Sequence, residues 1–292
     1  MRSLLFVPGD DERKIAKGLG SAADALILDL EDSVAPQRKA AARELCAATL
    51  KSARSAKTLF VRINALETAD ATLDIAAIVP ARPFGLMLPK CRGGEDIRTL
   101  DEHLSRREAK AGVTAGQIRV LPIVTETGAS MFGLGSYGPP AHPRLCGVMW
   151  GGEDLAADLG AIANRDASGA YTAPYQLARS LCLYAAAAAS VPAIDAVYTD
   201  FRDTEGLKAE TAKGLRDGFS GKAAIHPDQV VPINAAFTPS AADVERARRI
   251  VAAFDAAGGA GVAAIDGKML DRPHLRGARR VLERAREAGA LA

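Results

Sequence analysis

Short apolar runs alternate with longer segments of helical period along most of the chain. The apolar runs predict strands at residues 3–8, 24–30, 58–64, 84–90, 119–126, 145–153, 193–200 and 221–227. Between them, alanine-rich amphipathic segments predict helices near 11–20, 36–54, 70–79, 94–110, 127–134, 173–190 and 204–217. Strands that are apolar on both faces and separated by helices are typical of a parallel sheet covered on both sides.

The number of these units indicates a closed sheet. Eight strands with an unchanged rhythm predict an α/β fold of the (β/α)₈ TIM-barrel type, and 292 residues are enough for such a barrel and an extension. A doubly wound open sheet is the alternative, which the absence of an internal change of rhythm disfavours. We expect residues 1–239 to form the barrel and to carry the catalytic site.

The pattern changes beyond Pro239, and residues 240–292 predict a C-terminal helical extension. Residues 240–256 have the period of one helix that starts near Ser240. The run 258–261 (GGAG) predicts a flexible joint, 262–265 a short strand, and the segment from Pro273 onward a basic helix. We expect this extension to pack on the barrel or on a neighbouring subunit.

Composition narrows the class of protein. The chain is 48% hydrophobic and 25% charged, with a formal net charge of +2, which gives no reason to expect nucleic acid or an anionic membrane as a partner. The four cysteines are scattered without metal-ligand spacing, as in reduced cytosolic proteins. No segment has the pattern of a targeting signal or a membrane span, so we expect a cytoplasmic protein.

Polar residues concentrate where the predicted strands end. Because the carboxyl ends of barrel strands meet at one mouth, the following side chains are expected to converge there: Asp29, Glu31, Asp32, Arg62, Asn64, Lys90, Glu126, Glu153, Asp154, Asp200, Lys222 and His226. Each taken alone has a structural explanation, such as a helix cap at Asp154. Together, the carboxylates outnumber the cations, so a bound divalent cation is a natural complement. Oxygen ligands without a histidine or thiolate set favour Mg²⁺ or Mn²⁺.

Several motifs together resemble the citrate lyase beta-subunit-like family of the HpcH/HpaI aldolase superfamily, which includes malyl-CoA and citramalyl-CoA lyases. The motifs are RSLLFVPG (2–9), DALILDLEDSV (24–34), FVRIN (60–64), MLPK (87–90), PIVTETG (122–128), WGGEDLAADLG (150–160), AIDAVYTDFRDTEGL (193–207), GFSGKAAIHPDQV (218–230) and DGKMLDRP (266–273). They cover nearly the whole chain in the family's order. The resemblance implies a (β/α)₈ barrel assembled as a homotrimer or hexamer, whose C-terminal extension contributes to a neighbour's active site.

The resemblance also implies roles for individual residues. The Mg²⁺ ligands would be Glu126 of T-E-T and Asp154 of G-G-E-D, and Arg62 of V-R-I-N would bind the substrate and stabilise the enolate. Asp271 of K-M-L-D resembles the acid/base aspartate that the extension offers to a neighbouring subunit. Glu31 and Asp32 look like carboxylates that orient metal-bound water. The expected substrate and CoA contacts are Phe6, Arg13, Lys14, Asn64 and Lys90.

This chain departs from the family near the metal ligand. Family members often follow the glutamate with Ala-x-Gly, whereas residues 127–130 here read Thr-Gly-Ala-Ser, and the loop GLGSYGPP (133–140) is not general. These departures concern the acyl substrate more than the metal.

The resemblance implies a Mg²⁺-dependent lyase that cleaves or forms a 3-hydroxyacyl-CoA such as malyl-, citramalyl- or citryl-CoA through a CoA enolate, with a 2-oxoacid as the other product. Four alternatives stay open at this point, the last of them a barrel that merely binds a ligand, for which the metal carboxylates would have to be dispensable. A CoA-independent class II aldolase of 2-oxoacids is the nearest, and a carrier-protein-dependent citrate lyase beta subunit is the second. A class I aldolase that uses Lys90 or Lys222 as a Schiff-base amine is the third.

Overall fold

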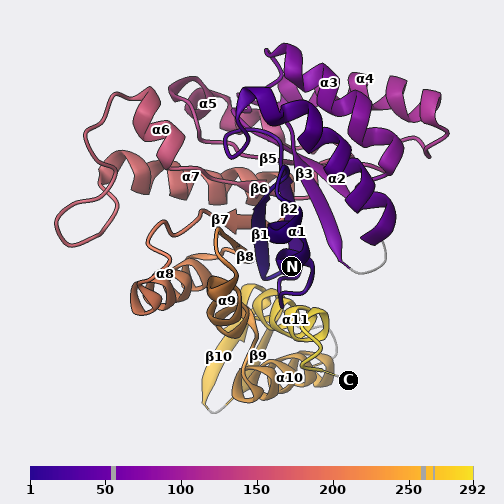
Figure 1. The fold of residues 1–292 in the computed structure, drawn as a ribbon. Coiled ribbons are helices and arrows are strands. Elements are labelled where there is room, and N and C mark those ends of the chain that lie inside the picture. The colour runs from indigo at the N-terminus through magenta and orange to yellow at the C-terminus, as the bar shows by residue number, and fades with distance from the viewer. Residues whose placement is uncertain (54–56, 258–260, 266, 292) are drawn as a thin grey trace.

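Eight parallel strands make up the centre of the computed structural model, which describes residues 1–53, 57–257, 261–265 and 267–291. Within these ranges the strand order is β5-β4-β3-β2-β1-β8-β7-β6 (Figure 1). The strands are β1 (Ser3–Pro8), β2 (Ala25–Asp29), β3 (Thr58–Arg62), β4 (Gly85–Leu88), β5 (Arg119–Pro122), β6 (Val148–Met149), β7 (Ala193–Asp195) and β8 (Gly221–Ala224). The predicted TIM-barrel fold is therefore confirmed.

Helices alternate with these strands and cover the barrel. In Figure 1, α2, α3 and α4 lie on one side of the strands and α5, α6 and α7 on the other. The helices are α1 (Glu12–Leu19), α2 (Lys39–Ala53), α3 (Ala69–Ile78), α4 (Gly94–Ala111), α5 (Gly128–Gly133), α6 (Glu153–Asp158), α7 (Ala173–Ala189), α8 (Thr204–Asp217) and α9 (Val230–Phe237), with short 3₁₀ turns η1 (Pro36–Arg38), η2 (Val79–Ala81), η3 (Leu134–Tyr137) and η4 (Pro227–Gln229). The short helices α6 and α9 have no counterpart in the sequence-based prediction.

The barrel closes between β5 and β6. Parallel bridges join Val120 to Leu145 and Ile123 to Met149, and the amide of Val124 donates to the carbonyl of Met149 at 2.8 Å. This seam is looser than the others, because β6 has two residues, where the sequence predicts a strand over 145–153. The other predicted strands begin at or within one residue of the observed starts. The strand predicted over 3–8 also ends as observed, whereas the other six end too late, since most of these runs continue into buried residues at the mouth.

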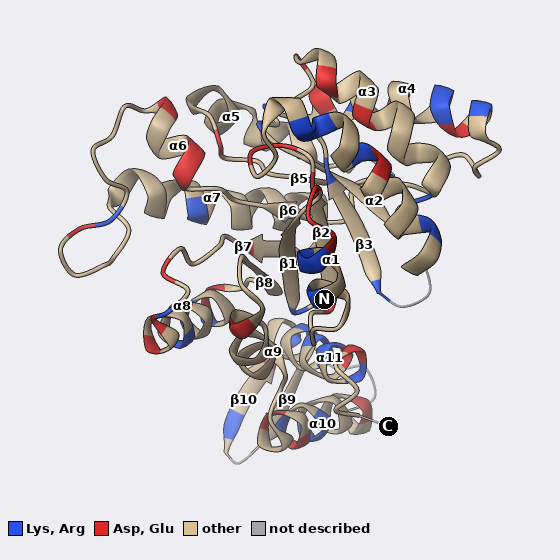
Figure 2. Cartoon of the chain, viewed as in Figure 1, with Lys and Arg blue, Asp and Glu red and all other residues tan. Residues whose placement is uncertain are grey.

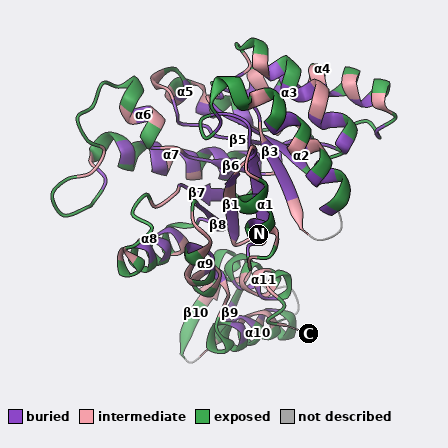
Figure 3. Cartoon of the chain, in the orientation of Figure 1, coloured by how far each residue is buried: buried purple, intermediate pink, exposed green. Residues whose placement is uncertain are grey.

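Alternation along the strands separates two cores. Side chains such as Leu4, Ile27 and Phe60 fill the inside of the barrel, whereas their neighbours, such as Leu5 and Leu26, pack outward against the helices. Figure 3 shows the central strands as almost entirely buried. The same alternation turns residues at the carboxyl ends of the strands into the mouth.

The C-terminal extension follows α9 and forms its own helical layer. It consists of α10 (Ala241–Ala256), a hairpin of β9 (Val262–Ile265) and β10 (Lys268–Asp271), and α11 (Arg272–Glu287). The two helices pack on each other, and much of their surface is exposed (Figure 3). The predicted strand at 262–265 and both predicted helices are present, whereas β10 was not predicted from the sequence. The predicted joint at 258–261 lies largely outside the described residues.

The amino-terminal residues lie at the end of the barrel opposite the mouth. Arg2 forms a hydrogen-bonded ion pair with Asp24 at 2.8 Å and donates to the Thr238 hydroxyl at 2.8 Å. The terminal amine of Met1 pairs with Glu287 of α11 at 3.4 Å. These contacts connect the start of β1 to the extension. Across the described residues, the structure contains no helix whose length and apolar character would let it span a bilayer.

A buried ion pair supports the seam between β5 and β6, and its removal is expected to destabilise the fold. Arg144 is 3% exposed and binds the fully buried Glu108 of α4 through two hydrogen bonds of 2.8 and 2.7 Å. Arg144→Met leaves that carboxylate without its cation, which costs about 3–5 kcal/mol. We therefore expect Tm to fall by about 10 °C in thermal unfolding followed by circular dichroism. Arg98→Met removes an exposed ion pair of α4 and serves as the control; equal Tm values for the two variants would contradict the assignment.

Candidate active site

Two side chains directly opposite each other on β2 and β3 define the floor of the mouth. Asp29 and Arg62 are register partners, and both follow inward-facing residues by two positions. The guanidinium donates from Nε and Nη2 to the two carboxylate oxygens of Asp29, each at 2.7 Å. The guanidinium carbon also lies 5.0 Å from the centre of the Phe6 ring, a cation–π contact. Arg62 is thereby held in one orientation.

The close contact between Arg62 and Asp29 keeps both side chains in their charged forms. Burial is the largest single influence and would lower the pKa of Arg62, but the hydrogen bonds to Asp29 together with the charges of Asp29, Glu31 and Glu126 outweigh it and raise that pKa. Burial is likewise the largest influence on Asp29 and would raise its pKa, but the hydrogen bonds and charge of Arg62, with further hydrogen bonds from Ser33 and Glu31, bring that pKa below its usual value. Arg62 is therefore a permanent cation at the mouth, and Asp29 is ionised. From sequence alone Asp29 is one of several strand-end carboxylates, and the structure shows that it is the residue that orients Arg62.

Glu31 and Lys90 form a second layer of charge above this pair. Glu31 is 6% exposed; its Oε1 accepts a hydrogen bond from the ammonium of Lys90, and its Oε2 lies 2.9 Å from Nη1 of Arg62. That second approach is not aligned for a hydrogen bond, so among the described residues Oε2 has no donor. Asp32 is exposed and lies 3.7 Å from Arg62 and 3.9 Å from Lys90. Both carboxylates thus surround the cations of the mouth.

Lys90 adopts an unusual backbone conformation that serves Glu126. Its φ is +52°, a left-handed value that non-glycine residues seldom adopt. In this conformation its amide donates to Oε2 of Glu126, while its ammonium lies 3.4 Å from Asp154. Burial would lower the pKa of Lys90, but the hydrogen bond to Glu31 and the neighbouring carboxylates raise it.

The two predicted metal ligands line the same cavity. Glu126 and Asp154 lie on the wall of a cavity of about 300 Å³ that also exposes Phe6, Arg62 and Tyr171. Glu126 is 3% exposed, and burial together with the charge of Asp154 raises its pKa to about 8. Asp154 comes from the first turn of α6, two residues after Gly152. Figure 2 shows acidic residues on α6 and in the loop that follows β2.

This donor set suits a divalent cation. In the described ranges no three side chains of His, Cys, Asp or Glu converge on one point. Mg²⁺, however, is commonly held by one or two carboxylates, with water and substrate oxygens completing the octahedron. A cation between Glu126 and Asp154 would counter both the burial and the mutual repulsion that raise the pKa of Glu126. The residues present therefore fit Mg²⁺ or Mn²⁺.

The other predicted contacts lie outside this cavity wall. Asn64 is buried, and its amide donates to the carbonyl of Leu30 at 3.0 Å and to Asp74 at 2.7 Å, so it supports the segment after β2 from below. Arg13 and Lys14 are exposed on the first turns of α1, with Lys14 paired to Asp11 at 3.7 Å. Asp271 is 54% exposed at the junction of β10 and α11, where it contacts His274. Within one subunit the extension therefore leaves Asp271 apart from the mouth.

Neither lysine has the environment of a Schiff-base nucleophile, which must lose its proton. Lys90 carries a raised pKa, as described above. Lys222 is fully buried beside Glu210 at 2.9 Å and Asp195 at 3.5 Å, away from the cavity wall. A class I aldolase mechanism therefore has no support in this geometry.

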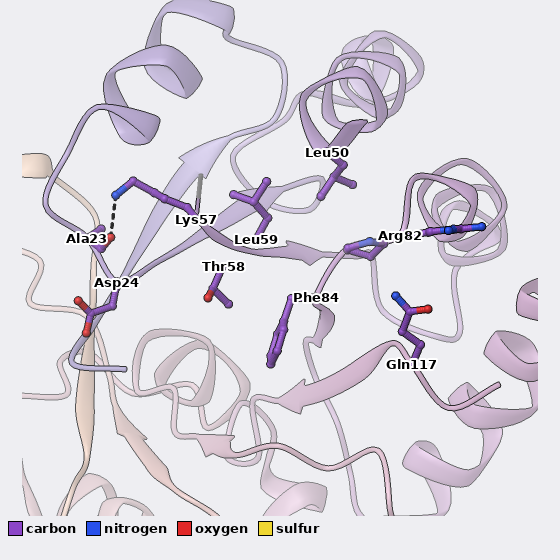
Figure 4. A pocket seen from close by; sticks show the side chains of 10 residues that line it. Ala23, Asp24, Leu50, Lys57, Thr58, Leu59, Arg82, Phe84 and Gln117 are labelled. Atoms are coloured by element: carbon purple, nitrogen blue, oxygen red, sulfur yellow. Dashed lines mark hydrogen bonds between the residues drawn. The ribbon is translucent and has the colours of Figure 1, made fainter. Parts of the chain in front are cut away.

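A larger cavity, of about 770 Å³, lies at the amino ends of β2 to β5 (Figure 4). Its cations are already engaged: Lys57 donates to the carbonyls of Ser21 and Ala23, and Arg82 to that of Gly112. Barrel enzymes place their chemistry at the carboxyl ends of the strands. The smaller cavity at the mouth, with its paired carboxylates and oriented arginine, is therefore the candidate active site.

Fold and site define a TIM-barrel enzyme of a carbon–carbon lyase family. The chain matches the family described as HpcH/HpaI aldolase/citrate lyase over residues 2–227, and it belongs to this family. This confirms the resemblance seen in the sequence and the expectation of a lyase-family enzyme.

Its relatives and structural neighbours carry several names. It is 37% identical to a (3S)-malyl-CoA thioesterase of Cereibacter sphaeroides, over 99% of this chain and 96% of that protein. It is 34% identical to mitochondrial citramalyl-CoA lyase of Mus musculus, over 96% and 85% of the two chains. The crystal structure of CitE from Mycobacterium tuberculosis in complex with magnesium, acetoacetate and coenzyme A is similar, with a TM-score of 0.79, 35% identity and 97% coverage of both chains.

A glycine next to the carboxylates provides a test of the site's geometry. A Cβ at Gly151 would lie 2.9 Å from Cγ of Glu126 and 3.1 Å from the side chain of Ile123, so Gly151→Ala must displace Glu126. We expect the affinity for Mn²⁺, measured by calorimetry, to fall about 10- to 100-fold, as for residues that orient a ligand. Gly135→Ala, where an added Cβ would point into open space, is the matched control. Unchanged Mn²⁺ affinity in Gly151→Ala would exclude Glu126 as a ligand.

Proposed function

We propose that this protein is a Mg²⁺-dependent lyase that cleaves or forms the carbon–carbon bond of a 3-hydroxyacyl-CoA, such as malyl-, citramalyl- or citryl-CoA. The observation that carries the proposal is the convergence of Glu126, Asp154 and Arg62 on one cavity at the barrel mouth. The CitE structure with magnesium, acetoacetate and coenzyme A supports the choice of metal and of a CoA thioester.

Each residue of the site has a distinct task in this reaction. Glu126 and Asp154 hold Mg²⁺, which would supply Lewis-acid polarisation of the substrate oxygens. Arg62, fixed by Asp29, presents its remaining N–H groups to the oxygen that gains negative charge as the enolate forms. Because its orientation is set before substrate binds, little reorganisation is needed during the reaction. Glu31 and Asp32 surround Arg62 and Lys90, and in this proposal they orient water around the metal.

Substrate binding follows from the shape of the mouth. Phe6 stacks on Arg62 and lines the cavity beside apolar Ile123 and Met149, which suits a small acyl chain. Arg13 and Lys14 project from the start of α1, directly after β1 on the mouth side, and we assign them to the phosphates of CoA. Lys90 contacts Glu31 and Asp154 and does not line the cavity. We therefore assign it two roles, to balance the charge of these carboxylates and to bind the carboxylate of the substrate.

The acid/base residue is Asp271, contributed by a neighbouring subunit. Its exposure and its position on the extension leave it free to enter another copy's mouth. In this proposal residues 1–239 form the catalytic barrel, residues 240–292 complete the adjacent site, and the protein assembles as a homotrimer or hexamer. The expected cytoplasmic location stays a prediction.

A second candidate function is hydrolysis of the thioester bond. It is favoured by the (3S)-malyl-CoA thioesterases of Cereibacter sphaeroides, which are 36–37% identical to this chain. The products distinguish the two reactions: a lyase releases a 2-oxoacid and a shorter acyl-CoA, whereas a thioesterase releases the free thiol of CoA. The two remaining alternatives differ from the lyase in substrate. A CoA-independent aldolase would act on a substrate without a thioester, and a carrier-dependent citrate lyase beta subunit would be inactive on thioesters of free CoA.

A thioester panel tests the lyase directly. Malyl-, citramalyl-, citryl- and methylmalyl-CoA are incubated with and without EDTA, with 2-oxoacid detected as its hydrazone and free CoA by a thiol reagent. We expect 2-oxoacid without thiol, loss of turnover in EDTA, and a fall of about 100-fold or more for Glu126→Gln, because several kcal/mol of stabilisation is removed. Glu95→Gln, on the exposed face of α4, is the control. Full activity of Glu126→Gln in EDTA would refute the mechanism.

Complementation between two inactive variants tests the role of Asp271. In co-assembled Glu126→Gln and Asp271→Asn subunits, a mouth with an intact Glu126 can receive an intact Asp271 from its neighbour. Random 1:1 assembly should restore activity in about a quarter of the sites of a cyclic oligomer. Each variant alone remains inactive. No recovery in mixed oligomers, confirmed as mixed by mass spectrometry, would show that Asp271 does not act across subunits.

A further inference from the structure

Six side chains beside the cavity form a closed circuit of contacts, which we call the contact ring. Its members are Trp150, Tyr171, Arg165, Glu210, Lys222 and Asp195, each touching the next and the last touching the first. They come from the end of β6, the loop between α6 and α7, α8, β8 and β7 (Figure 1). The ring thus joins the long α6–α7 loop to the barrel.

The aromatic half of the ring forms part of the cavity wall. Tyr171 lines the cavity, and its ring meets Trp150 edge-on, with centres 4.9 Å apart and planes at 75°. The guanidinium of Arg165 lies 3.7 Å from the centre of the Tyr171 ring on the other side. Both geometries are favourable for aromatic and cation–π contacts. Tyr171 is therefore held between a buried indole and a cation.

The charged half of the ring alternates in sign; Arg165 and Glu210 are partly buried, and Lys222 and Asp195 are fully buried. Arg165 pairs with Glu210 at 2.7 Å, and Glu210 accepts from Lys222 at 2.9 Å. Lys222 lies 3.5 Å from Asp195, whose other oxygen accepts from the indole N–H of Trp150 at 2.6 Å. Lys222 and Asp195 are 0% and 1% exposed, so each charge depends on its partners to remain buried.

The ring lies next to the segment that carries Asp154. Trp150 directly precedes Gly151 and Gly152, whose backbones have wide freedom, and Asp154 follows two residues later. A Cβ at Gly152 would lie 3.0 Å from the Trp150 ring and 3.6 Å from the Tyr171 ring. The side chain of Asn164, next to Arg165 in the loop, donates to Glu153 at 2.8 Å. The position of Asp154 therefore depends on how firmly these neighbours are held.

We propose that Arg165 is a positioning residue, which closes the contact ring and thereby fixes Asp154 and the Tyr171 wall of the cavity. Arg165 is the point where the aromatic half meets the charged half, because its guanidinium both stacks on Tyr171 and pairs with Glu210. It also donates to the carbonyl of Gly169 at 2.8 Å, which closes the tip of its own loop. The part concerning metal affinity rests on the proposed function, in which Asp154 binds Mg²⁺.

Trp150 is the only tryptophan of the chain, so its fluorescence reports on the ring independently of activity. Three variants are compared with wild type: Arg165→Met, which removes the charge; Arg165→Lys, which keeps the charge without the planar stacking group; and Arg98→Met, which removes an exposed arginine–glutamate pair. We expect Arg165→Met to shift or quench the Trp150 emission and to weaken Mn²⁺ binding about tenfold, as for residues that orient a ligand. Arg165→Lys should be intermediate and Arg98→Met unchanged.

The opposite results overturn the proposal. A folded Arg165→Met protein with wild-type emission and wild-type Mn²⁺ affinity would show that the ring does not position the site. If Arg165→Met does not fold, Tyr171→Leu, which opens the aromatic half alone, takes its place with the same expected and contrary outcomes. Wild-type protein that binds no Mn²⁺ would refute the proposed metal site and with it the ring's role in metal binding. Unchanged Trp150 emission in Arg165→Met refutes the ring itself.

Discussion

The pairing of Arg62 with Asp29 is the interaction on which the architecture of the mouth depends. A buried guanidinium is tolerated only when carboxylates satisfy it, and the register of β2 and β3 places Asp29 directly opposite. Glu31 contacts both Arg62 and Lys90, and the backbone amide of Lys90 donates a hydrogen bond to Glu126. The cation that faces the substrate and the carboxylates that face the metal are therefore coupled through one connected set of charges.

The barrel could be predicted from sequence because its signals are local. Apolar runs separated by helical segments gave the strand starts to within a residue, except at β6, where the chain pairs by isolated bridges. The short helices α6 and α9 were missed, although α1 and α5 of the same lengths were predicted. Glu153, the first residue of α6, falls within the strand predicted over 145–153, and α9 carries Pro232 in its first turn. The strand ends other than that of β1 were placed too late, because residues that follow most of these strands at the mouth are themselves buried.

In the candidate site, too, the residues that local sequence patterns could reveal differ from those whose roles depend on distant contacts. Glu126, Asp154 and Arg62 lie at strand ends or just beyond, and the structure brings them to one cavity. Asn64 ends a predicted strand too, yet its amide donates to Leu30 and Asp74, and these contacts join segments that are distant along the chain. The role of Asp29 was accessible in principle, since alternation from Ala25 and Ile27 turns it inward. The other members of the contact ring lie 15 to 72 residues from Trp150 along the chain, so no local pattern reveals them.

The anchoring of the amino terminus has a consequence for longer versions of this chain. Met1 and Arg2 contact Glu287, Asp24 and Thr238 at the end of the barrel remote from the cavity. A fused partner or linker placed ahead of Met1 would emerge on that side and leave the approach for substrate open. It would disturb the ion pair to the last helix, because the amine that makes it would become part of a peptide bond. Such a fusion would therefore alter the junction between barrel and extension and leave the candidate active site unchanged.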